Sequence, residues 1–237
     1  MASGAGGRGE RVLLLRRCAA IATLLIGFAL QRAVSQTAFL PIQSKSPQSL
    51  GSAMLLVASR DLTDPHFAET VILLVHYDAD NVLGLIVNRR TKVPLSEAFE
   101  TLQAAKGRAD SVYTGGPVDP SSVFALRRST EKLDGATSVF GTVYFITGKT
   151  LFEKTIGSRP DPADFRVYLG YTGWTNAQLR KEVEVGAWFL FRADAGAIFD
   201  GDPDSLWSRL IRRTEQKFAR FPSAVRHGQV FEIERAP

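Results

Sequence analysis

Short apolar runs separated by polar turns dominate the chain from residue 51 to residue 191. Runs rich in β-branched and apolar residues predict strands over 52–58, 70–76 and 82–88, the last two joined as an antiparallel hairpin. Because almost every position of that hairpin is apolar, we expect both of its faces to be covered. Similar patterns predict further strands over 123–126, 139–145 and 186–191, and alternation with period two predicts one over 165–170.

Helical spacing and start signals predict three helices outside residues 170–188. Pro94 precedes a helix expected from Leu95 to about Gly107, and a short helix is expected over 151–156. Asp202-Pro203 caps a final amphipathic helix, whose apolar positions are Leu206, Leu210, Ile211 and Phe218. Strands outnumber helices and do not alternate with them, which predicts the α+β class rather than a doubly wound sheet.

The most distinctive run, from residue 170 to residue 188, predicts a junction between a strand and a capped helix. Thr175 stands where a helix N-cap is expected, and Gln178 three positions later completes a capping box. Trp174 precedes the cap and Leu179 is the fourth helical residue, so the two side chains form a hydrophobic staple. These residues therefore have structural roles in the predicted junction.

The remaining residues of this run divide between structure and function. Gly170 and Gly173 are expected to serve the turn that brings the strand into the cap, and Gly186 is expected to end the helix. Tyr171 and Glu182 have no such structural explanation. A functional interpretation uses both side chains, together with the glutamine of the capping box, as polar groups in a cleft.

Paired glycines mark a second tight connection, Gly115-Gly116-Pro117-Val118. Successive N–H groups of paired glycines are able to hold an anion. A strand-to-strand connection that needs positive φ explains the same residues, and Pro117 removes one of the N–H donors. The structural interpretation is favoured.

The net charge of +5 comes from the N-terminal segment and not from the rest of the chain. The first fifty residues hold six of the 29 basic side chains and one of the 24 acidic ones, so the rest of the chain is neutral. A neutral domain has no general attraction to phosphate backbones, and nucleic acid is therefore disfavoured as a partner. Basic residues of the final helix, Arg209, Arg212, Arg213, Lys217 and Arg220, are interpreted as a solvated face, with an acidic partner or lipid head groups as the alternative.

The N-terminal segment has the pattern of a targeting sequence. Thirteen uncharged residues, Cys18–Leu30, follow Arg11, Arg16 and Arg17. This stretch is shorter than the ~20 residues of a membrane-spanning helix, and it suits the apolar core of a signal peptide. Ala33-Val34-Ser35 then supplies small residues at the spacing that a signal peptidase recognises.

These features divide the chain into three parts. Residues 1–35 are predicted to be a signal peptide or membrane anchor, with membrane contact through 12–30, and residues 36–49 a linker. Residues 50–237 then form a single domain with a C-terminal amphipathic helix extension. The predicted location is exported, periplasmic or membrane-anchored. The alternatives are an organellar transit peptide, or a cytoplasmic protein whose true start lies downstream.

Familiar catalytic and metal-binding patterns are absent from the sequence. Cys18 is the only cysteine, no Gly-x-Ser-x-Gly elbow occurs, and the histidines are scattered. Gly148-Lys149-Thr150 lacks the earlier glycine of a phosphate-binding loop, because Val143 occupies that position. We therefore assign no catalytic residue, no metal ligand and no cofactor.

An ordered set of short motifs resembles the AlgH/YqgE family over roughly residues 48–210. The motifs are Gly51–Ala58, Asp64-Pro65-x-Phe67, Thr70–Leu74, Gly84–Arg89, Gly115–Val118, Gly170-Tyr171-x-Gly173-Trp174, Gln178-Leu179-x-x-Glu182 and Gly186–Trp188. The resemblance implies one compact α+β domain, with a mixed, largely antiparallel bifurcated sheet that partly closes into a small barrel surrounded by helices. It implies no established catalytic activity; one branch takes its name from a proposed role in regulating alginate synthesis.

Three hypotheses about function follow. The leading one is a non-enzymatic binding or regulatory domain with a protein or small-ligand partner; its candidate ligand-binding residues are Asn88, Arg89, Gly115, Gly116, Tyr171, Gln178 and Glu182. The second is an enzyme that acts on a small polar ligand near Asn88, Arg89 and Glu182. The third is a transcriptional regulator, which the neutral domain and the leader both disfavour.

Overall fold

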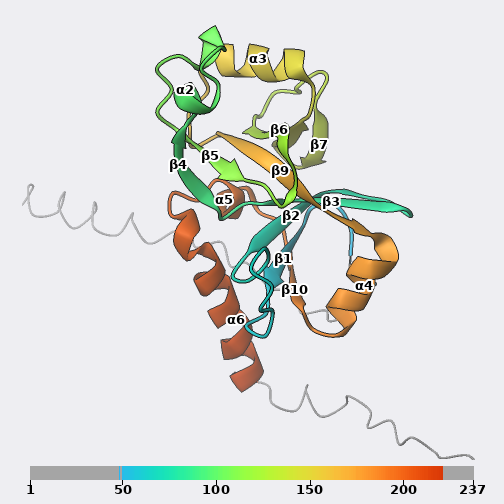
Figure 1. Ribbon diagram of the computed structural model, residues 1–237. Helices are drawn as coiled ribbons and strands as arrows, with labels where there is room; N and C mark the ends of the chain where they lie inside the picture. Colours follow the sequence, from blue (N-terminus) through green and yellow to red (C-terminus); the bar gives the residue numbers. More distant parts are fainter. Residues whose placement is uncertain (1–47, 49, 221–237) are drawn as a thin grey trace, which may run out of the picture. The chain divides into compact units, whose positions relative to one another are not determined.

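The computed structural model describes residue 48 and residues 50–220 (Figure 1). The predicted signal peptide or anchor over 1–35 lies outside the described residues, as do the chain beyond residue 220 and all of the linker except Gln48. In the described part, no helix combines the length and the apolar character needed to cross a membrane.

Two sets of strands share one long strand. The first set is β1 (Met54–Ala58), β2 (Val71–Tyr77), β3 (Asn81–Ile86) and β10 (Trp188–Arg192). The second is β4 (Arg90–Pro94), β5 (Ser111–Thr114), β6 (Val118–Arg128), β7 (Thr137–Phe140) and β8 (Val143–Ile146). The shared strand is β9 (Phe165–Thr175), which pairs with β5 and β6 through its first part and with β3 through its last.

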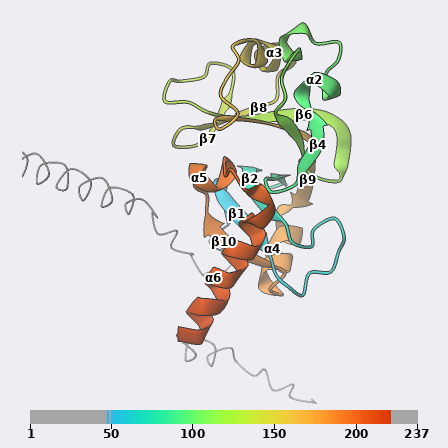
Figure 2. The same cartoon turned by 90° about the vertical axis from the view of Figure 1, so that its left-hand side faces the viewer.

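The strand order is β10-β1-β2-β3-β9-β6-β8-β7, with β4 and β5 branching from β9. Every pair is antiparallel except β5 with β9. The sheet is therefore bifurcated and curls into a half-barrel, with β6, β7 and β8 arching over β9 in Figure 2. The predicted α+β class and the bifurcated sheet are confirmed.

Short helices and one long helix flank the strands. They are α2 (Leu95–Ala98), η2 (Gln103–Ala105), α3 (Lys149–Gly157), α4 (Asn176–Glu184), α5 (Ala195–Ile198), η3 (Pro203–Ser205) and α6 (Leu206–Arg220). Helices α2 and α3 lie at one end of the molecule, and α4 and α6 flank the strands at the other (Figure 1).

The predicted helix from Leu95 to Gly107 is wrong, because the chain forms only the two short turns α2 and η2 there. The N–H groups of Leu95 and Ser96 donate to carbonyls of the returning chain at Asp110 and Arg108. Phe99 leaves the helical region with a φ of −130° and packs its ring 5.3 Å from that of Phe152. Tertiary packing thus overrides the helical pattern.

Two strand predictions also need correction. The single strand expected over 139–145 is a hairpin of β7 and β8, because Gly141 takes a φ of +47° and reverses the chain. Strand β4 was not predicted, since its residues are mostly exposed and no alternating pattern marks them.

The predicted turn at Gly170 and Gly173 is wrong as well. Strand β9 continues through both residues, and Gly173 pairs with Leu83 of β3. Gly170 has a φ of +71° in mid-strand, and a Cβ atom there would lie 2.5 Å from the Gly116 carbonyl oxygen. Gly170 is therefore required where β9 passes from one set of strands to the other.

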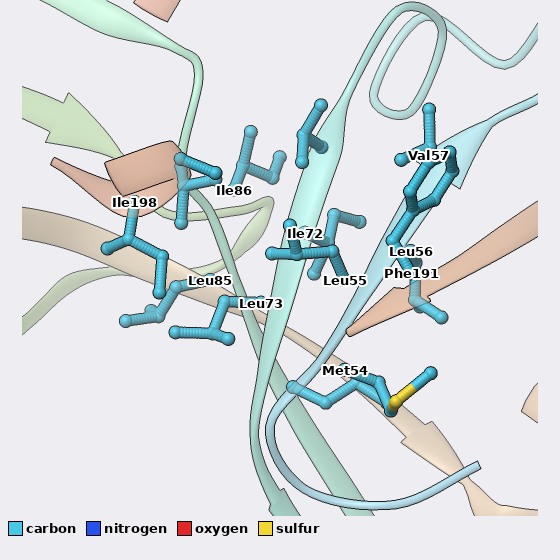
Figure 3. Close-up of a cluster of buried hydrophobic side chains, with 14 of the residues drawn as sticks. Met54, Leu55, Leu56, Val57, Ile72, Leu73, Leu85, Ile86, Phe191 and Ile198 are labelled. Atoms are coloured by element: carbon cyan, nitrogen blue, oxygen red, sulfur yellow. The ribbon is translucent and has the colours of Figure 1, made fainter. Parts of the chain in front are cut away.

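The main core lies among β1, β2, β3, β10 and α5 (Figure 3). The fully buried side chains of its central strands include Leu55, Leu56, Ile72, Leu73 and Leu85. Full burial of each such side chain contributes roughly 1.5–3 kcal/mol of transfer free energy. The expectation that both faces of the β2–β3 hairpin are covered is confirmed.

Helix α6 packs against β1 by means of its apolar side. Leu206, Leu210 and Ile211 are buried as predicted, and the Trp207 indole donates a hydrogen bond of 2.8 Å to the Ala58 carbonyl oxygen. Asp202 does not cap the helix main chain; its carboxylate instead accepts from a nearby serine hydroxyl. The side chains of residues 216–220, Phe218 included, lie outside the described part.

Candidate functional site

Asn88 fastens the loop between β1 and β2. We call residues 64–70 the β1–β2 loop. The Asn88 side chain is buried, its Oδ1 accepts the Val71 N–H at 2.7 Å, and its Nδ2 donates to the Glu69 carbonyl oxygen at 3.0 Å. Glu69 has a φ of +58°, which is costly for a residue with a Cβ atom. Both ends of the Asn88 amide therefore serve to hold a strained end of the loop.

Arg89 holds the other side of the same loop. Its Nη2 donates to the carbonyl oxygens of Pro65 at 3.1 Å and Ala68 at 3.3 Å. Burial lowers the pKa of Arg89, and the nearby Asp64 carboxylate opposes part of that change. The guanidinium thus binds main chain within the molecule.

Glu182 on α4 is the acceptor for two tryptophans. Its Oε2 accepts from Trp174 Nε1 at 3.0 Å and from Trp188 Nε1 at 2.8 Å. The two indoles meet edge to face at 6.2 Å, and the Phe67 ring lies about equally far from both. We call Phe67, Trp174, Glu182 and Trp188 the tryptophan cluster. Glu182 therefore has a structural role that the sequence did not reveal.

The predicted cap of α4 is confirmed in part. Thr175 Oγ1 accepts the Gln178 N–H at 3.2 Å, as a capping box requires. The Gln178 side chain does not return to the Thr175 main chain; its Nε2 donates to Glu182 Oε1 at 2.9 Å. Gly186 ends the helix as predicted, with a φ of +83° and an N–H bonded to the Val183 carbonyl oxygen.

The Gly115-Gly116 pair lies where β9 changes partners. The Gly115 N–H donates to the Leu169 carbonyl oxygen, and its own carbonyl oxygen accepts from Ile86, both at 2.8 Å. A Cβ atom at either glycine would lie 2.2 Å from a carbonyl oxygen of β9. Close approach of two backbones, and not positive φ, therefore requires these glycines.

Tyr171 lies beside this crossing and is half-buried. Its ring meets that of Phe124 edge to face at 5.8 Å. The seven candidate residues thus form two groups. Asn88 and Arg89 bind the β1–β2 loop, whose Phe67 lies against the two tryptophans that Glu182 binds, and Gln178 binds Glu182. The glycine pair and Tyr171 lie instead at the strand crossing. None of the seven lines either cavity described next.

A cavity of about 490 Å³ opens beside β4, β5 and the start of β9. We call it the Arg166 cavity. Its wall includes three aromatic and three charged residues: Arg90, Tyr113, Phe165, Arg166, Phe199 and Asp200.

Arg166 is the unusual member of this wall, because its side chain is charged and only 6% of the residue is exposed. Its guanidinium carbon lies 4.7 Å from the centre of the Tyr113 ring and 6.0 Å from that of Phe199. Its nitrogens donate to the main-chain carbonyl oxygens of Val87 and Asp200. Among the described residues, no carboxylate forms an ion pair with it.

The other charges of this wall are paired. The Asp200 carboxylate binds Arg209 at 2.6 Å, and Arg90 binds Asp204 at 2.9 Å. Asp110 binds Arg108 through both carboxylate oxygens, at 2.8 and 2.7 Å. Burial raises the pKa of Tyr113 above its ordinary value of 10.0, and its phenol is neutral at physiological pH in either case. The cavity therefore holds one positive charge that no carboxylate of the described chain balances.

A second cavity of about 510 Å³ lies between η2, α3 and β6. Its wall is mostly apolar and includes Phe99, Leu102 and Phe152. Its two charged residues, Lys149 and Glu153, lie 3.9 Å apart as an exposed pair. No unbalanced group marks this cavity as a binding site.

Sequence reasoning did not select Arg166. Arg166 lies in the strand that alternation predicts over 165–170, but all residues from Phe165 to Tyr168 are buried. An arginine inside an otherwise apolar strand was the available signal. Across residues 50–220, no group of three histidine, cysteine or acidic side chains is placed to hold a metal ion.

The bifurcated half-barrel defines the fold class, and comparisons with known proteins identify the family. The sequence profile of the AlgH-like family matches residues 55–219, which include most of α6. A UPF0301 protein of Chlorobium phaeobacteroides is 30% identical over 166 residues, covering 70% of this chain and 87% of that protein. The chain belongs to the AlgH-like family.

Solved structures agree with this assignment. The solution structure of AlgH from Pseudomonas aeruginosa is 26% identical, with a TM-score of 0.53, and the match covers 84% of this chain and 100% of that one. A crystal structure from Corynebacterium diphtheriae, 21% identical, shares the fold with a TM-score of 0.58 over 70% of this chain and 87% of that one. The resemblance found in the motifs is confirmed. The names of these relatives state no reaction and no ligand.

Proposed function

We propose that this chain is a non-enzymatic binding domain whose ligand occupies the Arg166 cavity, and that it acts as a regulatory domain through that ligand. The observation that carries the proposal is the buried Arg166 guanidinium, which lies against two aromatic rings and has no carboxylate partner in the described chain. The cavity is large enough for a small molecule, and its wall combines aromatic side chains with charged and polar ones that could orient a ligand.

The polar groups of the motif residues support a structural role in place of catalysis. Both ends of the Asn88 amide, the Arg89 guanidinium and both Glu182 oxygens have hydrogen-bond partners inside the molecule. A catalytic group needs a free atom within hydrogen-bond reach of a substrate. This argument favours a binding domain over an enzyme that uses Asn88, Arg89 and Glu182.

Binding to the cavity is testable with a small fragment library of neutral, cationic and anionic aromatic compounds. Thermal shift and isothermal titration should detect at least one fragment that stabilises the wild-type protein. Ala163 is exposed and lines the cavity, so Ala163→Trp narrows it without disturbing the core. Loss of fragment binding in that variant is expected, whereas Glu184→Ala on α4 should bind as wild type does.

An outcome in which no fragment binds would overturn this proposal, as would fragments that bind equally well to the Ala163→Trp variant. Turnover is a separate question. If Asn88→Ala and Glu182→Ala variants that fold abolish conversion of a bound fragment, then the enzymatic alternative replaces the binding one.

We further propose that residues 1–35 direct the domain out of the cytoplasm or anchor it. The supporting observations are the basic start, the thirteen uncharged residues and the small residues before position 36. Cell fractionation with N-terminal sequencing of the mature protein should find a new N-terminus near residue 36, or an intact chain in the membrane fraction. An intact chain in the soluble cytoplasmic fraction would contradict this and reopen a transcriptional role.

A further inference from the structure

We infer that the ligand of the Arg166 cavity is an organic anion, with a carboxylate or phosphate group joined to a flat apolar body. The inference rests on the proposed function, since it names the chemical class that the cavity binds. Charge, shape and the position of a second guanidinium each support it.

The buried guanidinium of Arg166 favours an anionic ligand, because burying a cation is costly. A guanidinium taken out of water needs hydrogen-bond acceptors and, in most proteins, an opposite charge. Arg166 has carbonyl acceptors from Val87 and Asp200 but no carboxylate among the described residues. Of the acidic residues of the cavity wall, Asp110 and Asp200 are already bound to other arginines. A ligand anion supplies the missing charge and fits the planar fork of the guanidinium.

The aromatic wall of the cavity favours a ligand with a flat apolar body. Tyr113, Phe165 and Phe199 all line the cavity, and the guanidinium of Arg166 lies near two of these rings. Aromatic side chains pack well against flat apolar groups, either stacked or edge to face. An inorganic ion alone would leave this apolar surface facing water. A ring or similar flat group attached to the anion covers it.

Arg90 supplies a second positive group at the same wall. It lines the cavity and is paired with Asp204, and both side chains are substantially exposed. Exposed ion pairs contribute little to stability, so exchanging Asp204 for a ligand oxygen costs little. We therefore expect Arg90 to contribute to anion binding, with a smaller effect than Arg166.

Three compounds of nearly the same shape test the charge directly. Benzoate, benzamide and benzamidine share one ring and differ in carrying a negative, a neutral or a positive group. Titrated into the full-length wild-type protein, benzoate should bind about tenfold more tightly than benzamide, and benzamidine more weakly than either. Phenyl phosphate should bind more tightly than inorganic phosphate, because its ring covers the aromatic wall, and equal affinity of the two would overturn the flat apolar body.

Variants assign the charge preference to Arg166. Arg166→Gln should bring the affinity for benzoate to within about twofold of that for benzamide, and Arg166→Lys should retain part of the difference. Arg60→Gln is the matched control, because it removes the same charge from an exposed site outside the cavity. If Arg166→Gln does not fold, the wild-type comparison and the Ala163→Trp variant still decide the question.

The outcomes separate this inference from the proposed function. Equal affinity of benzoate and benzamide for wild type, with both lost in Ala163→Trp, overturns the anion class and leaves the binding site standing. Preferential binding of benzamidine also overturns it. Benzoate binding that Arg166→Gln weakens and Arg60→Gln does not is the supporting result. Failure of all three compounds and both phosphates, at concentrations up to about 10 mM, counts against the proposed function itself.

Discussion

The β1–β2 loop and the Arg166 cavity differ in how their polar groups are satisfied. Around the loop, Asn88, Arg89 and Glu182 all bond to groups within the molecule. In the cavity, the Arg166 guanidinium has main-chain acceptors and aromatic neighbours but no counter-charge in the described chain. The first region is rich in sequence motifs, and the second has none.

A region rich in sequence motifs can therefore reflect strict local requirements of the fold and need not be a binding site. Glu69 needs positive φ, two indole N–H groups need an acceptor, and two backbones meet without room for a Cβ atom at the strand crossing. Each requirement limits the residue types allowed. A binding site needs fewer fixed residues, and those at the Arg166 cavity come from separate strands and loops.

The largest effect is expected at the strand crossing. Gly116→Ala places a Cβ atom 2.2 Å from the Tyr171 carbonyl oxygen, so the free energy of unfolding should fall by about 3 kcal/mol or more. Gly173→Ala is the matched control, because its Cβ atom would meet only the Tyr171 ring at 3.4 Å and should change stability by less than about 1 kcal/mol. Urea denaturation measures both. Equal stability of the two variants would show that the crossing is not tight.

The tryptophan cluster should give the next largest effect. Glu182→Ala leaves the indole N–H groups of Trp174 and Trp188 without their acceptor, and we expect a loss of roughly 2–3 kcal/mol. Glu184→Ala, on the same helix but exposed, should cost less than about 0.5 kcal/mol. Tryptophan fluorescence during denaturation reports the change. The affinity of Glu182→Ala for fragments in the Arg166 cavity should stay at the wild-type value. A large loss of that affinity would indicate that Glu182 contributes to ligand binding and is not only scaffold.

A smaller loss is expected at the end of the β1–β2 loop. Asn88→Ala removes the partners of the Val71 N–H and the Glu69 carbonyl oxygen, at a cost of about 2 kcal/mol. Hydrogen exchange should show faster exchange of the Val71 amide than in wild type. Asn176→Ala, whose amide bonds at the surface, is the control. If the exchange rate of the Val71 amide is the same as in wild type, Asn88 does not hold the end of the β1–β2 loop.

The smallest change in stability is expected for Tyr168→Phe, and this change depends on pH. Its hydroxyl is buried beside the Arg166 guanidinium without a well-aligned hydrogen bond, so Tyr168→Phe should change stability by less than about 1 kcal/mol at neutral pH. Burial raises the pKa of Tyr168 above its ordinary value of 10.0, with Arg166 opposing part of the rise. The unfolded chain therefore loses this proton first, and the contribution present below pH 10 is lost as the pH rises further.

Stability of the wild type should consequently fall more steeply above pH 10 than that of Tyr168→Phe. Thermal unfolding at a series of alkaline pH values measures the two slopes. Parallel curves would indicate that Tyr168 is not held neutral by burial.

Local patterns predicted most of the fold, because they depend on neighbouring residues. The hairpin of β2 and β3, the Thr175 cap and the Gly186 stop all follow from short-range spacing. The predicted strand over 165–170 is shorter than β9, because Gly170, where β9 kinks, has the local sequence pattern of a turn. The pairing that carries β9 into both sets of strands involves residues far apart in sequence.

The candidate site was harder to predict, for a physical reason. Glu182 has a role only because Trp174 and Trp188 meet beside it in three dimensions. An arginine inside an otherwise apolar strand marks Arg166 in the sequence, but its lack of a counter-charge is visible only once the positions of the nearby carboxylates are known. Spacing alone reveals neither this arrangement nor the role of Glu182.

We expect ligand to bind at the Arg166 cavity and the motif residues to serve as scaffold. Titration of uniformly labelled wild-type protein with benzoate, followed by amide chemical shifts, tests this most directly. We expect shifts that saturate at Tyr113, Arg166 and Gly201, which line the cavity, with Gln178 and Glu182 unmoved. Saturable shifts centred on Gln178 and Glu182, with the cavity residues unmoved, would contradict it.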